Sequence, residues 1–176
     1  NLSKVGNDIY VTGNLGDSYI GLNILKGKYN FKKFNNYFVQ RYYKPNLPIK
    51  ISNHLYKIAN SSIDISDGLA QDLKHICTSS KCGAHINLNL LPFSKPTKSL
   101  IKKNQLNIKK IFSNGDDYEI LFTSNRKKRF IINKLSKKLN LKITRIGTIT
   151  KGGNITFEHN TKNVRFNKEN WGYIHN

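Results

Sequence analysis

The chain has 176 residues, which is enough for one domain with a hydrophobic core and marginal for two. Its 30 Lys and Arg residues outnumber its 10 Asp and Glu residues, so the formal net charge at neutral pH is +20. The composition is typical of a globular protein, and the absence of a long apolar run excludes a membrane-spanning chain.

The amino-terminal end predicts a piece of a longer protein. The chain starts at Asn1, contains no Met, and reaches an expected strand within a few residues. It shows no secretory pattern of basic, apolar and small residues. Cys77 and Cys82 have the spacing of neither a disulfide framework nor a paired metal site. We therefore expect a cytoplasmic fragment with reduced thiols and no membrane partner.

The strong positive charge makes a basic RNA-binding module one hypothesis, because a basic stripe is the usual footprint of nucleic-acid binding. Lys greatly outnumbers Arg, however, and Arg is the better residue for gripping phosphates and bases. The lysines are also scattered along the chain. Lys, Asn and Ile are all frequent and all have AT-rich codons, so codon bias explains the charge better than a nucleic-acid partner does.

Strands and helices alternate along the predicted chain. A strand is expected at 7–12, a glycine turn at 13–16, and helices at 17–25, 34–43 and 49–59. A strand at 61–65 runs into a helix over 67–79, and the next strand spans 83–88. Residues 95–110 are expected to be helical or loop, before a strand at 118–123, a helix at 127–139 and a strand at 142–150.

A turn near the end of the chain decides the fold class. The sequence KGGN at 151–154 predicts a hairpin, with the chain returning as a strand at 155–157. A hairpin breaks a purely parallel βαβ pattern, so we expect a single α/β (α+β layered) domain over 1–176, with a mixed sheet flanked by helices.

Three features of the helices carry further expectations. The turn before helix 17–25 can cradle a phosphate, although a plain tight connection is the default, and Asp17 or Ser18 can cap that helix. The basic run Arg126–Arg129 is expected on a solvated helix face. The polar face of helix 67–79 carries Asp72 and His75, which we also expect to be solvated.

Seven of the ten acidic residues gather in three short segments: GNLGDS at 13–18, DISDGLAQD at 64–72 and NGDDYE at 114–119. Clustered carboxylates repel one another unless a cation lies between them, and such oxygens suit magnesium. Asp17 leaves a structural and a functional role equally open. Asp64 ends a predicted strand, and Ser66 and Asp67 lie at the junction with the following helix, whose N–H groups favour phosphate oxygens. Gly68 allows close backbone approach.

Three motifs in this order resemble thiamine-monophosphate kinase: VTGNLGDSYIGL at 11–22, SSIDISDGLAQDL at 61–73 and NGDDYEILFT at 114–123. The tail WGYIH at 171–175 resembles the end of that family. The aspartate–serine–aspartate–glycine core recurs among relatives of aminoimidazole ribonucleotide synthetase, whereas the acidic DDYE motif is more specific for the thiamine enzyme.

The resemblance implies the C-terminal half of a two-domain, homodimeric enzyme. Its N-terminal domain, which would supply dimerisation and most ATP and magnesium ligands, lies outside this sequence. The implied reaction transfers the γ-phosphoryl group of ATP to thiamine monophosphate and gives thiamine diphosphate, with Mg²⁺ as cofactor. We expect the fragment alone to be inactive.

The resemblance also implies roles for individual residues. Asp64 and Asp67 resemble magnesium ligands, and Ser66 resembles an ATP contact. Asp116 takes an acidic substrate-contact position that could face the cationic thiazolium, and Tyr173 resembles an aromatic residue that packs on the substrate. The family's usual Gly-Gly is Asn114-Gly115 here, and Asn also tolerates positive φ.

Three alternatives stay open. One is another ATP-dependent synthetase of the same superfamily. A second is the basic RNA-binding module, and a third is an inactive product of a truncated gene.

Overall fold

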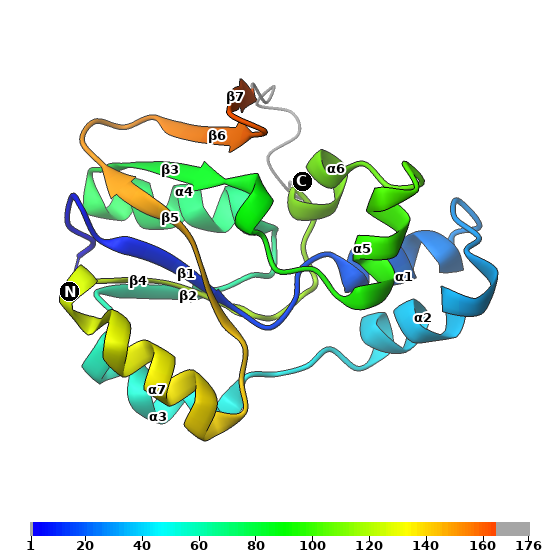
Figure 1. Ribbon diagram of the computed structural model, residues 1–176, viewed down its shortest axis with the longest axis horizontal. Helices are drawn as coiled ribbons and strands as arrows, with labels where there is room; N and C mark the ends of the chain where they lie inside the picture. Colours follow the sequence, from blue (N-terminus) through cyan, green and yellow to red (C-terminus); the bar gives the residue numbers. More distant parts are fainter. Residues whose placement is uncertain (1, 165–176) are drawn as a thin grey trace.

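The structure is a computed structural model that describes residues 2–164. Within that part of the chain, seven strands form one sheet in the order β2-β4-β1-β5-β3-β6-β7 (Figure 1). Neighbouring strands are antiparallel except β3 and β6, which run parallel. The predicted mixed sheet flanked by helices is therefore confirmed.

The strand boundaries lie close to those expected from the sequence. The strands are β1 Asp8–Thr12, β2 Ser61–Asp64, β3 Gly83–Asn87, β4 Ile120–Ser124, β5 Ile143–Thr150, β6 Ile155–His159 and β7 Lys162–Val164. Only β7 was not predicted.

The helices also follow the predicted order. They are α1 Asp17–Leu25, α2 Asn35–Tyr43, α3 Ile49–Ile58, α4 Leu69–Ser80, α5 Lys95–Lys102, α6 Ile108–Phe112 and α7 Arg129–Leu139. None of the helices within residues 2–164 has the length and apolar character needed to cross a membrane.

The two faces of the sheet are covered by different helices. Helices α3 and α7 lie on one face, and α4 lies on the other (Figure 1). Successive residues of a strand point to opposite faces, so Tyr10 of β1 packs in the cluster under α3 and α7, while Ile9 and Val11 join the larger cluster on the α4 side. All five residues of β1 are buried, as expected for a central strand.

The remaining helices gather beyond one end of the strands (Figure 1). Helices α1 and α2 pack closely because Gly21 has no side chain: a Cβ atom there would lie 2.1 Å from the carbonyl oxygen of Phe38. The Leu15 N–H donates to the Pro92 carbonyl oxygen at 2.8 Å, which ties the turn before α1 to the segment before α5. This end of the sheet holds the acidic turns described below.

The hairpin predicted at 151–154 is wrong. Strand β6 pairs in parallel with β3, and β3 lies between β5 and β6. The connecting turn passes over the start of β3, where a Cβ on Gly83 would lie 2.5 Å from the Asn154 carbonyl oxygen. The glycines of the turn indicate a reversal of the chain, but they do not determine which strand the returning segment joins.

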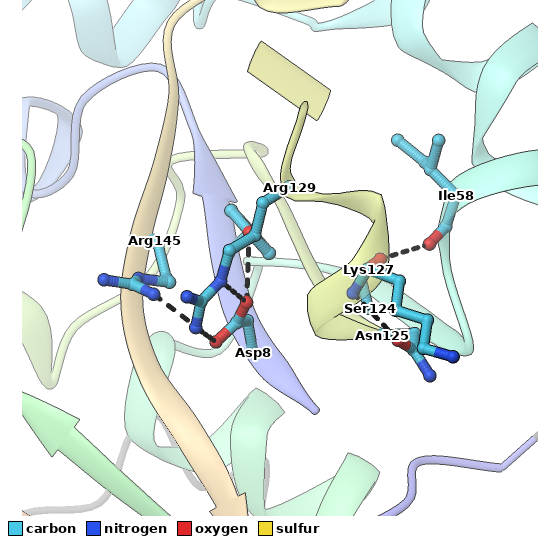
Figure 2. A network of polar contacts seen from close by, with 8 residues as sticks. Asp8, Ile58, Ser124, Asn125, Lys127, Arg129 and Arg145 are labelled. Carbon is cyan, nitrogen blue, oxygen red and sulfur yellow. Dashed lines mark hydrogen bonds and ion pairs between the residues drawn. The ribbon is translucent and has the colours of Figure 1, made fainter. Parts of the chain in front are cut away.

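Ion pairs to a buried carboxylate link β1, β5 and α7. The Arg129 guanidinium donates two hydrogen bonds, of 2.6 and 2.7 Å, to the fully buried carboxylate of Asp8, and Arg145 approaches the same group at 3.7 Å (Figure 2). Burial raises the pKa of Asp8, but the two guanidinium groups outweigh that effect and hold the pKa below its usual value. Arg129 stays 44% exposed, so it faces solvent as expected for the run Arg126–Arg129, while its guanidinium also binds Asp8.

The two cysteines lie where α4 ends and β3 begins. Both Cys77 and Cys82 are free thiols and buried, and burial raises the pKa of Cys77 to about 12. The expectation of two reduced thiols agrees with this arrangement, and neither thiol is poised to react.

Truncating Phe122 tests the core between the sheet and helices α3 and α7. Its ring is fully buried and stacks on Tyr10 with ring centroids 5.2 Å apart. We expect Phe122→Ala to lower the free energy of unfolding by about 3–5 kcal/mol, measured by urea denaturation. The matched control is Phe130→Ala on α7, where the ring is 77% exposed and the expected change is under about 0.5 kcal/mol. Equal losses in the two variants would contradict this packing.

Candidate functional site

Two acidic turns that lie about fifty residues apart in the sequence meet through their backbones. The Ile65 N–H donates to the Glu119 carbonyl oxygen at 2.7 Å, and the Tyr118 N–H donates back to the Ile65 carbonyl oxygen at 2.9 Å. One residue further on, the Asp116 N–H donates to the Ser66 carbonyl oxygen at 3.0 Å. The segments DISDG and NGDDYE thus continue the pairing of β2 with β4 beyond the end of the sheet.

Two glycines allow this contact. A Cβ on Gly115 would lie 1.8 Å from the Ser66 carbonyl oxygen, and a Cβ on Gly68 would lie 2.7 Å from that of Ser113. Gly68 also has a φ of 119°, which side chains rarely adopt. For this reason α4 begins at Leu69, two residues later than predicted.

The side chains of the second turn alternate between solvent and interior. Asp116 is half-buried and Tyr118 exposed, whereas Asp117 and Glu119 are buried. Asp116 and Tyr118 have positive φ values of 66° and 52°, so the strained backbone of this turn lies at these two positions. The turn therefore divides its acids into an outer set and an inner set.

The outer set contains the residues predicted from the sequence. Asp64 is exposed at the end of β2, and Ser66 and Asp67 are half-buried in the turn before α4. Burial raises the pKa of Asp116; the positive charge of Lys26 opposes this rise, and the carboxylate of Asp67 adds to it. Asp116 is thus close enough to Asp67 for the two charges to interact, as the predicted site requires.

Asp72 differs from its prediction. We expected a solvated carboxylate on the polar face of α4, but only 1% of Asp72 is exposed. Its Oδ2 accepts the Gly68 N–H at 3.1 Å. Burial raises the pKa of Asp72 to about 6, and the carboxylates of Asp67 and Asp64 contribute to the rise. Helical periodicity correctly placed Asp72 opposite the apolar face of α4. It could not show that the preceding turn folds back over that polar face and buries Asp72.

Asp72 also brings a third residue to the site. One ligand atom from each of Asp67, Asp72 and His75 lies within 4.8 Å of the others, and His75 is exposed as predicted. Asp64, the other predicted metal ligand, is not in this group of three. Magnesium prefers oxygen ligands, so a group of two carboxylates and one imidazole, in which Asp72 also accepts a hydrogen bond from Gly68, is a weak magnesium site.

The predicted ligands Asp64 and Asp67 fit magnesium by their chemistry. Both offer hard carboxylate oxygens, and both are at least partly open to solvent, so water and phosphate oxygens can complete a coordination shell. The Ser66 hydroxyl lies between them in the sequence, in the same turn.

The inner set ties this region to α1. Asp117 Oδ2 accepts the Gly16 N–H at 2.7 Å, and Asp117 also accepts a backbone hydrogen bond from Ser18. The start of α1 is therefore capped by a carboxylate from the second acidic turn, and neither Asp17 nor Ser18 caps it. The turn at 13–16 is thus the plain tight connection expected by default, because Asp117 accepts the Gly16 N–H that a phosphate would otherwise bind.

Asp17 and Glu119 complete a buried polar network. The hydroxyls of Tyr37, Ser94 and Thr97 donate to Asp17 at 2.6–2.8 Å, and the Thr12 hydroxyl donates to Glu119 at 2.5 Å. For Asp17, these contacts favour the structural role that the sequence left open. With Asp117 and Arg41, both acids line a pocket of about 50 Å³.

Burial raises the pKa of both inner acids of the second turn. The pKa of Glu119 rises to about 7, because burial outweighs the hydrogen bonds from Thr12 and the Asn14 backbone. The pKa of Asp117 rises well above its usual value for the same main reason, with the nearby Asp17 and Glu119 adding to the effect. No pattern in the sequence indicates that Asp117 and Glu119 are buried while the neighbouring Asp116 faces solvent.

One predicted site residue, Tyr173, lies outside the described residues.

Comparisons with known proteins agree with this arrangement. The family described as AIR synthase related protein, C-terminal domain, matches residues 4–160. A thiamine-monophosphate kinase from Buchnera aphidicola subsp. Schizaphis graminum is 41% identical over 98% of this chain and 54% of its own length. The chain therefore spans about half the length of the curated relatives it matches.

Solved structures are similar over the same extent. The crystal structure of thiamine-monophosphate kinase from Stenotrophomonas maltophilia K279a matches with a TM-score of 0.78 and 29% identity, covering 90% of this chain and 52% of that one. The structure of AaThiL complexed with AMPPCP and TMP matches with a TM-score of 0.75 and 31% identity, covering 92% of this chain and 50% of that one.

The raised pKa of Glu119 predicts how stability depends on pH. A carboxyl group whose pKa rises on folding favours the folded state below its unfolded pKa, and this contribution is lost as the pH rises through the folded value. The pKa of Glu119 rises from 4.5 to about 7. Wild type should therefore lose roughly 2–3 kcal/mol of unfolding free energy through this group as the pH rises from 5 to 8. Glu119→Gln lacks the group, so its free energy of unfolding should rise by that amount relative to wild type over the same range.

The measurement is the free energy of unfolding in urea at both pH values. Glu158→Gln on β6 is the matched control, since Glu158 is half-exposed toward the other edge of the sheet and, within residues 2–164, its carboxylate pairs only with the half-exposed His85, at 3.6 Å, a contact of small expected energy. The free energy of unfolding of this control should change between pH 5 and pH 8 by the same amount as that of wild type. A Glu119→Gln curve that also runs parallel to wild type would show that this carboxyl group is not the source of the dependence.

Proposed function

Because the chain belongs to the family of AIR synthase related proteins, as their C-terminal domain, we propose that it is the C-terminal domain of a thiamine-monophosphate kinase. The intact protein would transfer the γ-phosphoryl group of ATP to thiamine monophosphate. The thiamine-monophosphate kinases among its relatives, including the one from Escherichia coli K12 at 39% identity over 84% of this chain, support this assignment.

The observation that carries the proposal is the outer set of carboxylates. In a chain with a net charge of +20, the side chains of Asp64, Asp67 and Asp116 come from two distant motifs to one end of the sheet, and all three are open to solvent at least in part. Carboxylates that interact with one another in this way favour cationic ligands. A magnesium–nucleotide complex and a thiazolium ring both satisfy that requirement.

Each residue of the outer set has a proposed role. Asp64 and Asp67 would hold magnesium, which when bound neutralises phosphate oxygens and orients them. The Ser66 hydroxyl would contact ATP. Asp116 would face the positively charged thiazolium of thiamine monophosphate, and Tyr173 would pack against that substrate.

The chain's own contribution to the reaction is positioning. Phosphoryl transfer needs little covalent chemistry from the protein and depends on bringing acceptor and donor oxygens into line. The backbone bond from Asp116 to Ser66, at 3.0 Å, links the proposed substrate contact directly to the proposed ATP contact. A shift of one turn would therefore move both substrates relative to each other.

The intact protein would contain a second domain. The matched relatives are about twice as long as this chain, and the matched family is a C-terminal domain. We propose that a preceding domain supplies ATP binding and homodimerisation, and that the present chain alone has no kinase activity. Another ATP-dependent synthetase of the same superfamily is the alternative that substrate profiling would reveal.

The test is ATP-dependent conversion of thiamine monophosphate to the diphosphate by the intact protein. We expect Asp64→Asn and Asp116→Asn each to lower kcat/KM by about 100-fold or more, because each removes a charge that the substrates require. Asp116→Asn should mainly raise the KM for thiamine monophosphate. Asp64→Asn should mainly raise the magnesium concentration needed for half-maximal rate.

The control for this test is Glu158→Gln, which makes the same change in net charge on β6, five strand positions from β2. Its activity should equal that of wild type. A folded wild-type protein that phosphorylates no thiamine monophosphate, or two aspartate variants with full activity, would contradict the proposal.

A further inference from the structure

Asp72 is a buried acid whose hydrogen bonds all point back into the turn of the proposed site. Its Oδ2 accepts the Gly68 N–H at 3.1 Å, while its own N–H donates to the Gly68 carbonyl oxygen at 3.0 Å. The backbone of Asp67 donates to the same carboxylate. The side chain thus closes a small ring around the junction between β2 and α4.

One of these bonds occupies the N–H of Gly68, the residue that precedes the first turn of α4. The free N–H groups and the positive end of the helix dipole usually make such a position favourable for phosphate. At α4 the carboxylate of Asp72 already takes the N–H of Gly68, and its negative charge opposes a second anion. At α1 the carboxylate of Asp117 does the same to the N–H of Gly16, at 2.7 Å. Both helix starts therefore have a buried carboxylate bonded to the N–H of the N-cap residue.

The same bonds determine what the turn presents. With the N–H groups of Asp67 and Gly68 directed inward to Asp72, the half-buried side chain of Asp67 remains at the surface with Ser66. On the other side, the carbonyl oxygen of Ser113 leaves no space for a side chain at Gly68. The turn is held from both sides, so the position of the Asp67 carboxylate depends on Asp72.

We propose that Asp72 is a positioning residue that closes the start of α4 to anions and orients Asp67 toward a divalent cation. Phosphate groups would then be recognised in this domain through the cation and not through the helix N–H groups. This inference rests on the proposed function, because it takes Asp67 as a metal ligand. Partners that orient metal ligands typically change metal affinity by about 10- to 100-fold when they are removed.

The test measures binding of inorganic pyrophosphate to the intact protein by calorimetry, in EDTA and over a series of magnesium concentrations. Wild type should bind pyrophosphate only with magnesium. Asp72→Ala should raise the magnesium concentration for half-maximal binding by about 10- to 100-fold. Asp72→Asn keeps the shape and one acceptor oxygen, and should raise it by about tenfold. Hydrogen exchange at the Asp67 and Gly68 amides should become faster in both variants, and more so in Asp72→Ala than in Asp72→Asn.

Glu158→Gln is the matched control for charge and should behave as wild type does in every measurement. A thermal midpoint for each variant confirms folding, and Asp72→Asn carries the test if Asp72→Ala does not fold. A folded variant with the magnesium dependence and amide exchange of wild type would overturn the proposal. Pyrophosphate binding and amide exchange are both measured without turnover. Their outcome can therefore be distinguished from a failure of the proposed kinase activity.

Discussion

The close backbone contact between the two acidic turns is the constraint on which the candidate site depends. Gly115 lies against the carbonyl oxygen of Ser66, and Gly68 lies against that of Ser113, with no space for a Cβ atom at either position. Any side chain there would force the turns apart and break the bonds that extend the β2–β4 pairing. The sheet thus positions the motifs roughly, and the two glycines bring them into direct contact.

This contact also explains how one chain holds so many carboxylates in a small volume. Asp117 and Glu119 point inward, where backbone N–H groups and hydroxyls stabilise them, and burial raises the pKa of both. The pKa of Glu119 is about 7, so this carboxyl group carries only part of its charge near neutral pH. Asp64, Asp67 and Asp116 point outward, where water and cationic ligands can reach them. The inner acids therefore build the framework, and the outer acids remain available for binding.

Most of the fold could be predicted from the sequence, because hydrophobic period and turn residues act locally. Helix α1 has the expected boundaries, and β1 and α3 differ from expectation by one residue. The wrong hairpin at 151–154 has a different origin: strand pairing is decided by which neighbours β3 and β5 already have, and that information is distributed over the whole sheet. Likewise, the bidentate pair between Arg129 and Asp8 joins residues 121 positions apart and has no local signal.

The sequence indicated the acids that form the outer set of the candidate site, and it did not indicate the contacts of the inner acids. Acid clustering and motif resemblance indicated Asp64, Asp67 and Asp116 as site residues, and the structure brings the two motifs together. The same clustering did not show that Asp117 caps α1 or that Asp72 folds under the turn before α4. Acids usually lie in solvent, and these two are buried because backbone N–H groups from distant or folded-back segments replace water as their partners.

A crystal structure of the intact protein with manganese, a non-hydrolysable ATP analogue and thiamine monophosphate tests the central claim most directly. Anomalous scattering would locate the metal ions independently of any assumption about the site. We predict manganese peaks beside the carboxylates of Asp64 and Asp67, with the thiazolium next to Asp116. Metal ions and nucleotide bound elsewhere, with these three side chains facing only water, would contradict the account.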